Sequence, residues 1–160
     1  FGVRSWVEGS VAAFQPSIDL RGGTLSLDID AASWPDDLGD DPLFNGDRTY
    51  LDGALSNLLD NALRYAGDAA PAVSVTLTWA GGEAAHWRLE VSDQGLGIPT
   101  EHQKRIFERF HRVPTGNRHD VKGFGLGLHY VRTIMEAHGG AVACTSVFGK
   151  GSTFTLTLPS

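Results

Sequence analysis

Four stretches of the chain alternate apolar and polar residues, and they form two pairs that are each joined by a short glycine-containing turn. Residues 72–79 (AVSVTLTW) and 86–92 (HWRLEVS) flank Gly81 and Gly82, and residues 141–159 hold two further runs around a tight turn. Alternation with a period of two is typical of strands that bury one face, and paired glycines favour the turn of a hairpin. The chain is therefore predicted to contain two antiparallel hairpins.

Other segments carry the spacing of amphipathic helices. Near the N-terminus apolar residues recur every four positions, and Pro16 is expected to end that helix. A second helix is expected over about residues 47–66 with Asp47 as its N-cap, and a third runs to about residue 138, where two glycines stop it. A short helix is also expected over residues 100–110, and a fifth strand in the segment GGTLSLDID, residues 22–30, where Leu25, Leu27 and Ile29 alternate after a glycine turn.

This order of elements indicates an α+β chain, because the strands lie in adjacent hairpins and the helices are gathered between them. The predicted architecture is a two-layer α/β sandwich, in which about three helices cover one face of a mixed, mostly antiparallel sheet. The 160 residues suffice for one domain with a substantial core, so residues 1–160 are assigned to a single domain.

Charge and cysteine content argue against several classes of function. A net charge of −6 disfavours a nucleic-acid partner, whose binding surface would be broadly basic. The single cysteine, Cys144, excludes an internal disulfide and fits a reducing compartment, so a cytoplasmic location is expected. No apolar run approaches the roughly 20 residues that cross a bilayer, so we expect no membrane contact by this domain. Because the chain begins at Phe1, we expect it to be a piece of a longer protein.

The second helix carries two stripes. Leucines mark the expected core face, whereas Asn57, Asn61 and Arg64 recur at i, i+4 and i+7 on the opposite side. A solvated face is the simplest interpretation, although asparagine is a poor helix former. Two amide oxygens one turn apart could also serve as hard ligands for Mg²⁺, and an arginine one turn further could meet a phosphate. The helix alone leaves both interpretations open.

A strand-like run ends at Asp93 in the segment VSDQGLGIP, residues 91–99. Aspartate and glycine favour turns for local reasons, so an ordinary turn is one interpretation. The other is a buried carboxylate that accepts a hydrogen bond from the amino group of a base, with Gly95 and Gly97 letting a flat ring approach the backbone.

Three glycines, at positions 123, 125 and 127, precede the third helix in the segment GFGLGLHYV. Backbone N–H groups without neighbouring side chains, at the positive end of a helix dipole, favour anions such as phosphate. A dinucleotide fingerprint would need G-x-G-x-x-G directly after a strand, and a P-loop would need Gly-Lys-Ser/Thr at the helix start, so neither fits. A flexible hinge is the remaining alternative.

Taken together and in this order, these stretches resemble the ATP-binding catalytic domain of sensor histidine kinases, within the wider GHKL ATPase superfamily. LSNLLDNALRYA resembles the family's N box, VSDQGLGIP the G1 box, IFERFHRV the F box and GFGLGLHYVRTIMEAHGG the G2 box, and FGKGSTFTLTLP resembles the closing hairpin. The resemblance covers residues 47–158 well and the first 46 loosely. It implies the Bergerat fold, ATP and Mg²⁺ as cofactors, and a lid over residues 100–122. It also implies that residues 1–20 end the connection to a dimerisation and phosphoacceptor hairpin outside this chain.

The resemblance also implies a role for each matching residue. Asn61 is expected to coordinate Mg²⁺, Asn57 to assist at the phosphates, and Asp93 to accept from the adenine amino group. Arg64, Arg112 and Lys122 are expected to provide positive charge for the phosphates, and with Asn57 they form the implied catalytic set. The other ATP-binding residues implied are Tyr65, Gly95, Gly97, Ile98, Phe110, Gly123, Gly125, Leu126, Gly127 and Leu128.

Position 57 indicates which reaction to expect. The ATP-hydrolysing members of this superfamily carry a glutamate there, which can activate water, whereas Asn57 cannot act as that base. A neutral histidine brings its own lone pair, and phosphoryl transfer depends mainly on alignment and charge neutralisation. None of the six histidines has the sequence neighbours of the family's acceptor, so the acceptor is expected on a separate domain.

The predicted function is therefore transfer of the γ-phosphate of Mg-ATP to a histidine on a separate phosphoacceptor domain, within a two-component sensor kinase. A response regulator is the expected downstream partner. The alternatives are a degenerate, non-enzymatic nucleotide-binding scaffold and a GHKL ATPase or serine kinase.

Overall fold

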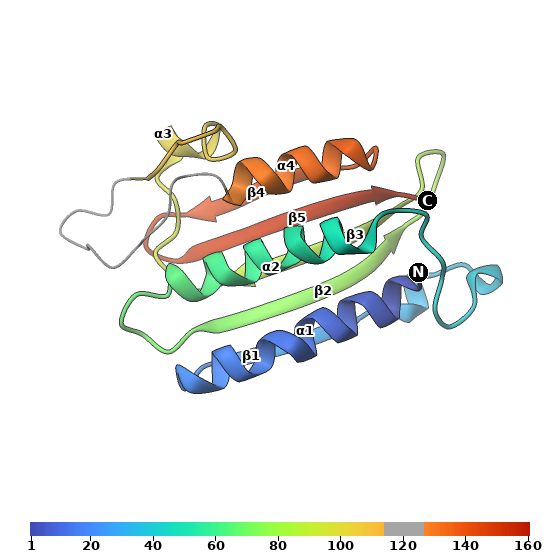
Figure 1. The fold of residues 1–160 in the computed structure, drawn as a ribbon, viewed down its shortest axis with the longest axis horizontal. Helices are drawn as coiled ribbons and strands as arrows, with labels where there is room; N and C mark the ends of the chain where they lie inside the picture. Colours follow the sequence, from blue (N-terminus) through green and yellow to red (C-terminus); the bar gives the residue numbers. More distant parts are fainter. Residues whose placement is uncertain (114–126) are drawn as a thin grey trace.

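The structure, a computed structural model, describes residues 1–113 and 127–160. Within them, five strands form one sheet in the order β1-β2-β3-β5-β4, and the long helices lie over one of its faces (Figure 1). The elements in chain order are α1 (Val3–Leu20), β1 (Thr24–Ile29), η1 (Ala31–Ser33), η2 (Asp36–Leu38), α2 (Arg48–Arg64), β2 (Ala72–Ala80), β3 (His86–Asp93), α3 (Thr100–Gln103), α4 (Gly127–Ala137), β4 (Ala141–Val147) and β5 (Gly151–Pro159).

The sheet is mixed, as predicted. β1 pairs with β2 in parallel, whereas β2 with β3, β3 with β5, and β4 with β5 are antiparallel. Alternate residues of the central strands are buried under the helices, for example Val73, Val75 and Leu77 on β2. The opposite face carries residues such as Ser74, which is exposed, and Thr76. The two-layer α+β prediction is therefore confirmed.

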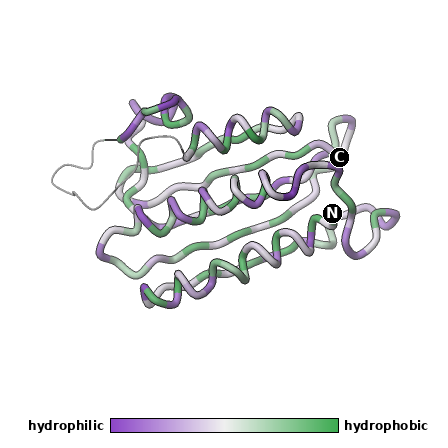
Figure 2. Tube along the Cα trace, in the orientation of Figure 1, coloured by the Kyte–Doolittle hydropathy of each residue, from purple (hydrophilic) through white to green (hydrophobic). Residues whose placement is uncertain are grey.

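The core lies between the sheet and α1, α2 and α4. Along these helices hydrophobic and hydrophilic residues alternate with the helical period (Figure 2), so that each helix buries one side. The predicted core stripe of α2 is confirmed at its leucines, which are at most 1% exposed. α1 contributes five fully or largely buried residues: Val3, Trp6, Val7, Val11 and Ile18.

The predicted end of the first helix at Pro16 is wrong, because α1 continues to Leu20 with the proline inside it. Proline removes one backbone hydrogen bond and typically destabilises a helix interior by about 3 kcal/mol. Pro16 is exposed, and the next turn buries Ile18 completely. Burial of that side chain, which local sequence rules ignore, favours continuation of the helix.

The N-cap of α2 is confirmed. The Asp47 carboxylate accepts hydrogen bonds from the backbone N–H groups of Thr49 and Tyr50, at 3.0 and 3.4 Å. The helix ends at Arg64, slightly before the predicted end, and Tyr65 is its C-cap. Gly67 then takes a φ of 66°, which glycine adopts without strain.

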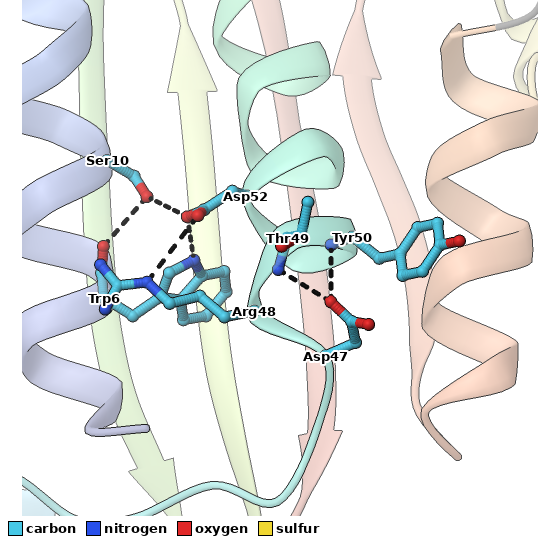
Figure 3. A network of polar contacts seen from close by, with 7 residues as sticks. All are labelled: Trp6, Ser10, Asp47, Arg48, Thr49, Tyr50 and Asp52. Atoms are coloured by element: carbon cyan, nitrogen blue, oxygen red, sulfur yellow. Dashed lines mark hydrogen bonds and ion pairs between the residues drawn. The ribbon is translucent and has the colours of Figure 1, made fainter.

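A polar network joins α1 to α2 (Figure 3). The Asp52 carboxylate accepts from the Trp6 indole N–H at 2.8 Å, and the Ser10 hydroxyl lies 3.0 Å from the same oxygen. Arg48 lies one turn before Asp52, with 3.8 Å between its Nε and a carboxylate oxygen. The contact fixes the position of α1 against the helix that carries the asparagine stripe.

The predicted helix over residues 100–110 is wrong beyond Gln103, where α3 ends. Successive turns follow, with Arg105 N–H donating to the His102 carbonyl and Glu108 N–H to the Arg105 carbonyl, each at 2.9 Å. Ile106, in these turns, is only 4% exposed. Tertiary packing of this turn therefore replaces the helix.

Candidate functional site

Asp93 is the last residue of β3, and it is half-buried. Its Oδ1 accepts the Gly95 backbone N–H at 2.9 Å. Burial raises the pKa of the carboxyl, and the N–H groups of Gly95 and Ser152 oppose that rise. A carboxylate that has lost part of its hydration is stabilised by any further hydrogen-bond donor that a ligand brings.

The loop after Asp93 is held from two sides. Leu96 N–H donates to the carbonyl of Tyr65, at the end of α2, at 2.9 Å. Ile98 N–H donates to the Ser146 hydroxyl of β4 at 2.8 Å, and the Gln103 amide donates to the Ile98 carbonyl at 2.9 Å. The loop is therefore anchored on α2, α3 and β4, and Ile98 also packs against the core.

Both glycines of this loop are required by close backbone contacts. A Cβ at Gly95 would lie 2.4 Å from the Tyr65 carbonyl oxygen. Gly97 has a φ of 68°, and a Cβ there would lie 2.2 Å from the Val147 carbonyl oxygen. The structural reason for these glycines is thus the packing of the loop, whatever part they have in binding.

The asparagine stripe meets the start of α4. Asn57 donates through Nδ2 to the Gly53 carbonyl at 2.8 Å, and its Oδ1 faces Gly127, where a Cβ would lie 2.8 Å away. Asn61, one turn further, is half-buried, and Leu128 packs against the core. The fold therefore places two segments that sequence analysis singled out, far apart in the chain, in direct contact.

Tyr65 lies among positive charges. Burial raises the pKa of its phenol, and the charges of Arg112 and Arg64 act against that rise. Since such effects need proximity, the arginine after the α3 turns lies near the end of α2. Both guanidinium groups belong to exposed residues.

The structure does not bring all the predicted site residues together. Phe110 is 66% exposed and has a φ of 65°, so its side chain is not packed with the others in this structure. The predictions for Lys122, Gly123, Gly125 and Leu126 concern residues outside the described ranges.

Sequence analysis missed Ser152, which lies beside Asp93, and Ser146, which contacts Ser152. Ser152 is the partner of Asp93 in the β3–β5 register and is only 8% exposed. The Ser146 and Ser152 hydroxyls lie 2.9 Å apart. The alternation along β5 could have indicated Ser152, because it places this serine on the buried face of the strand. Cys144 lies nearby, and burial followed by the charge of Asp93 raises the pKa of its thiol to about 12.

These residues gather at one end of the sheet, where α2 and β3 end and α4 begins (the left side of Figure 1). The site combines a shielded carboxylate, a stripe of amides and two arginines. Such a set fits a flat ring with an amino group that is joined to an anionic tail. Among the described residues no helix is long and apolar enough to cross a membrane.

Residues 46–160 match the family described as histidine kinase-, DNA gyrase B- and HSP90-like ATPase. The chain therefore belongs to this family of ATPases, and the resemblance inferred from its motifs is confirmed.

Two curated relatives are sensor proteins. The chain is 32% identical to sensor protein RprX of Bacteroides fragilis over 153 residues, which cover 96% of this chain and 28% of RprX. It is 36% identical to sensor protein SrrB of Staphylococcus aureus over 132 residues, which cover 78% of this chain and 22% of SrrB. The chain thus spans about a quarter of the length of these relatives.

Solved structures share the fold. The mycobacterial sensor histidine kinase MprB matches with a TM-score of 0.78 at 24% identity, over 99% of this chain and 96% of that one. The catalytic domain of histidine kinase ThkA matches with a TM-score of 0.77 at 24% identity, over 99% and 95%. Full-length ShkA in complex with AMPPNP matches with a TM-score of 0.76 at 25% identity, over 99% of this chain and 30% of that one. The predicted Bergerat fold is confirmed.

Proposed function

We propose that this chain binds Mg²⁺-ATP and transfers the γ-phosphate to a histidine on a separate phosphoacceptor domain of the same protein. A response regulator would then receive the phosphate, and the domain would work in the cytoplasm. The sensor-protein relatives and the AMPPNP complex of ShkA support this proposal. The observation that carries it is the shielded carboxylate of Asp93.

Asp93 recognises the adenine amino group in this proposal. Its side chain is fixed by the Gly95 N–H, so it meets a ligand in one orientation. A hydrogen bond to a poorly hydrated carboxylate is stronger than a hydrogen bond in water, since the local dielectric constant is low. Tyr65, Gly97 and Ile98 would form the walls of the ring pocket, because the Asp93 loop lies against α2.

The asparagine stripe and the arginines hold the phosphates. The described residues contain no cluster of three His, Cys, Asp or Glu side chains that could hold a metal by themselves. An amide oxygen from Asn61, together with phosphate oxygens and water, is instead a donor set that suits Mg²⁺. The ion would supply charge neutralisation at the phosphates. Asn57 would assist it, and Arg64, Arg112 and Lys122 would add positive charge, with Gly127 at the start of α4 near Asn57.

Transfer to histidine rather than to water follows from Asn57. Its amide donates to the Gly53 carbonyl and presents Oδ1 toward Gly127, so it is oriented but has no basic group. Water needs a base to become a nucleophile, and neutral imidazole does not. The chain would therefore hydrolyse ATP slowly and depend on its acceptor domain.

The first experiment measures nucleotide binding. The chain is titrated with a fluorescent ATP analogue, with and without Mg²⁺. Asp93→Asn should abolish binding, because the amide presents an N–H₂ or a weaker acceptor to the adenine amino group. Asp28→Asn, on the exposed side of β1, is the matched control and should bind like the wild type. Unchanged affinity in Asp93→Asn would remove the adenine assignment.

The second experiment measures transfer. The chain, labelled ATP and a separately produced acceptor domain should give acid-labile, base-stable protein phosphorylation, and Asn61→Ala should abolish it. Asn45→Ala, in an exposed loop, is the control. Rapid ATP turnover without the acceptor would instead favour the hydrolytic members of the family.

A further inference from the structure

Two imidazoles meet on the segment between the Asp93 loop and Arg112. His102 Nδ1 and His111 Nε2 lie 3.2 Å apart, and the ring centroids are 5.2 Å apart with 38° between the planes. Both residues are half-buried. The nitrogens that face each other are those through which histidine binds either a proton or a metal.

The backbone between these histidines is shaped to bring them together. Successive turns begin at His102, and the chain then reverses at Phe110, whose φ of 65° is uncommon for a residue with a side chain. Such a conformation typically costs about 1–3 kcal/mol. Phe110 is 66% exposed, so burial of its own side chain does not offset that cost. What the strained turn achieves is the placement of His111 against His102.

The segment is otherwise held firmly. Ile106 is 4% exposed, and the ring of Phe107 packs edge-on against Phe154 of β5 at 6.3 Å between centroids. His129 of α4 lies with Nδ1 3.3 Å from the Phe107 carbonyl oxygen. The two imidazoles are thus attached to a supported turn rather than to a free loop.

The separation of the two nitrogens matches a metal site. Zn²⁺ binds histidine at about 2.0–2.1 Å with tetrahedral geometry, which places two ligand nitrogens about 3.3 Å apart. We propose that His102 and His111 form a two-imidazole site for a divalent transition metal such as Zn²⁺, with water at the remaining positions. Mg²⁺ and Ca²⁺ would not bind there, because they prefer oxygen ligands.

The surroundings of His111 favour its neutral form. Imidazole must be neutral to ligate a metal. Burial, the charge of Arg105 and the neighbouring His102 lower the pKa of His111, and Glu108 acts in the opposite direction. The metal would take the place of the direct contact between the two nitrogens.

A metal here would also fix the chain one residue before Arg112, whose charge acts on Tyr65. The two imidazoles lie in the segment that is expected to form the lid, next to Arg112, but metal binding by them does not depend on the proposed function. Its test therefore uses no nucleotide.

The experiment is a calorimetric titration of the full chain with ZnCl₂ at pH 7.5. We expect one equivalent to bind, with affinity at least about tenfold weaker in His102→Ala and in His111→Ala. His86→Ala is the matched control, because His86 lies on β3 and contacts the Ala84 carbonyl at 2.8 Å. His111→Gln distinguishes metal binding from hydrogen bonding, since glutamine can still hydrogen-bond to His102 but is a poor ligand for zinc. MgCl₂ should give no binding.

Equal zinc affinity in the wild type and in both alanine variants would overturn the proposal, as would unchanged affinity in His111→Gln. Thermal unfolding without metal checks that each variant is folded. Binding should weaken from pH 7.5 to pH 5.5 as the imidazoles gain protons. An affinity that does not change over that range would also contradict a two-imidazole site.

Discussion

At the scale of single residues, the partial burial of Asp93 favours ligand binding in our proposal but lowers the stability of the fold at neutral pH. Its pKa is raised because the carboxylate loses hydration that Gly95 and Ser152 only partly replace. A carboxyl with a raised pKa binds its proton more tightly in the folded state than in the unfolded chain. Its contribution to stability is therefore greatest at low pH and is lost as the pH rises through the folded-state pKa.

We therefore predict that Asp93→Asn is at least as stable as the wild type at pH 7, although the proposed function requires that it loses nucleotide binding. The asparagine Oδ1 can still accept the Gly95 N–H. Urea unfolding of both proteins between pH 8 and pH 4 checks this prediction. The advantage of the variant should shrink toward the acid end. A variant that is clearly less stable at pH 7 would show that the charge of Asp93 supports the fold.

A second residue-scale prediction concerns Gly127. A Cβ there would lie 2.8 Å from Asn57 Oδ1, so Gly127→Ala should displace that amide and weaken ATP binding while the fold persists. Gly9→Ala, inside α1, is the control, because its Cβ would meet only Arg48 Nη2 at 3.7 Å. That control should gain about 0.5–1 kcal/mol of stability and keep its nucleotide affinity. If both variants bind ATP with equal affinity, Gly127 is not part of the nucleotide site.

At the scale of elements, the α1–α2 contact depends on Asp52. The indole N–H of Trp6 belongs to a residue that is 1% exposed, and Asp52 is its acceptor (Figure 3). Removing one partner leaves a buried donor unsatisfied, which costs about 1–3 kcal/mol.

Asp52→Ala should accordingly lower the free energy of unfolding by about 1–3 kcal/mol. Asp52→Asn should lower the free energy of unfolding by a smaller amount, because its amide oxygen can still accept a hydrogen bond from the Trp6 indole N–H. Asp60→Ala, on the exposed side of the same helix, is the control and should change stability little. Urea denaturation of the three variants gives the comparison, and equal losses at positions 52 and 60 would contradict this role.

At the scale of the whole molecule, the first 45 residues belong to the same core as the rest. The family match begins at residue 46, yet α1 buries five side chains and β1 pairs with β2 along its whole length. At about 1.5–3 kcal/mol each, the side chains of α1 alone contribute roughly 7–15 kcal/mol. That is comparable to the total stability of a typical domain, about 5–15 kcal/mol.

We therefore predict that a chain of residues 46–160 does not fold, whereas residues 1–160 unfold in one cooperative transition. Circular dichroism during heating, together with proton NMR dispersion, measures both. A shortened chain that melts cooperatively and binds nucleotide would show that residues 1–45 form an addition to the domain rather than part of it.

The sequence alone determined the features that depend on near neighbours. Alternation predicted the hairpins, Asp47 predicted the start of α2, and the motifs of the family predicted the polar groups of the site. These signals are readable because hydrogen-bonding capacity, side-chain spacing and turn preference are properties of short segments.

Only the tertiary structure decided the features that depend on distant contacts. α1 passes through Pro16 because Ile18 is buried in the core, and the helix after Pro99 stops early because Ile106 and Phe107 pack inward. The pairing of Asp93 with Ser152 and the meeting of Asn57 with Gly127 join segments far apart in the chain. Their free energy comes from burial and close packing in three dimensions, which no local pattern contains.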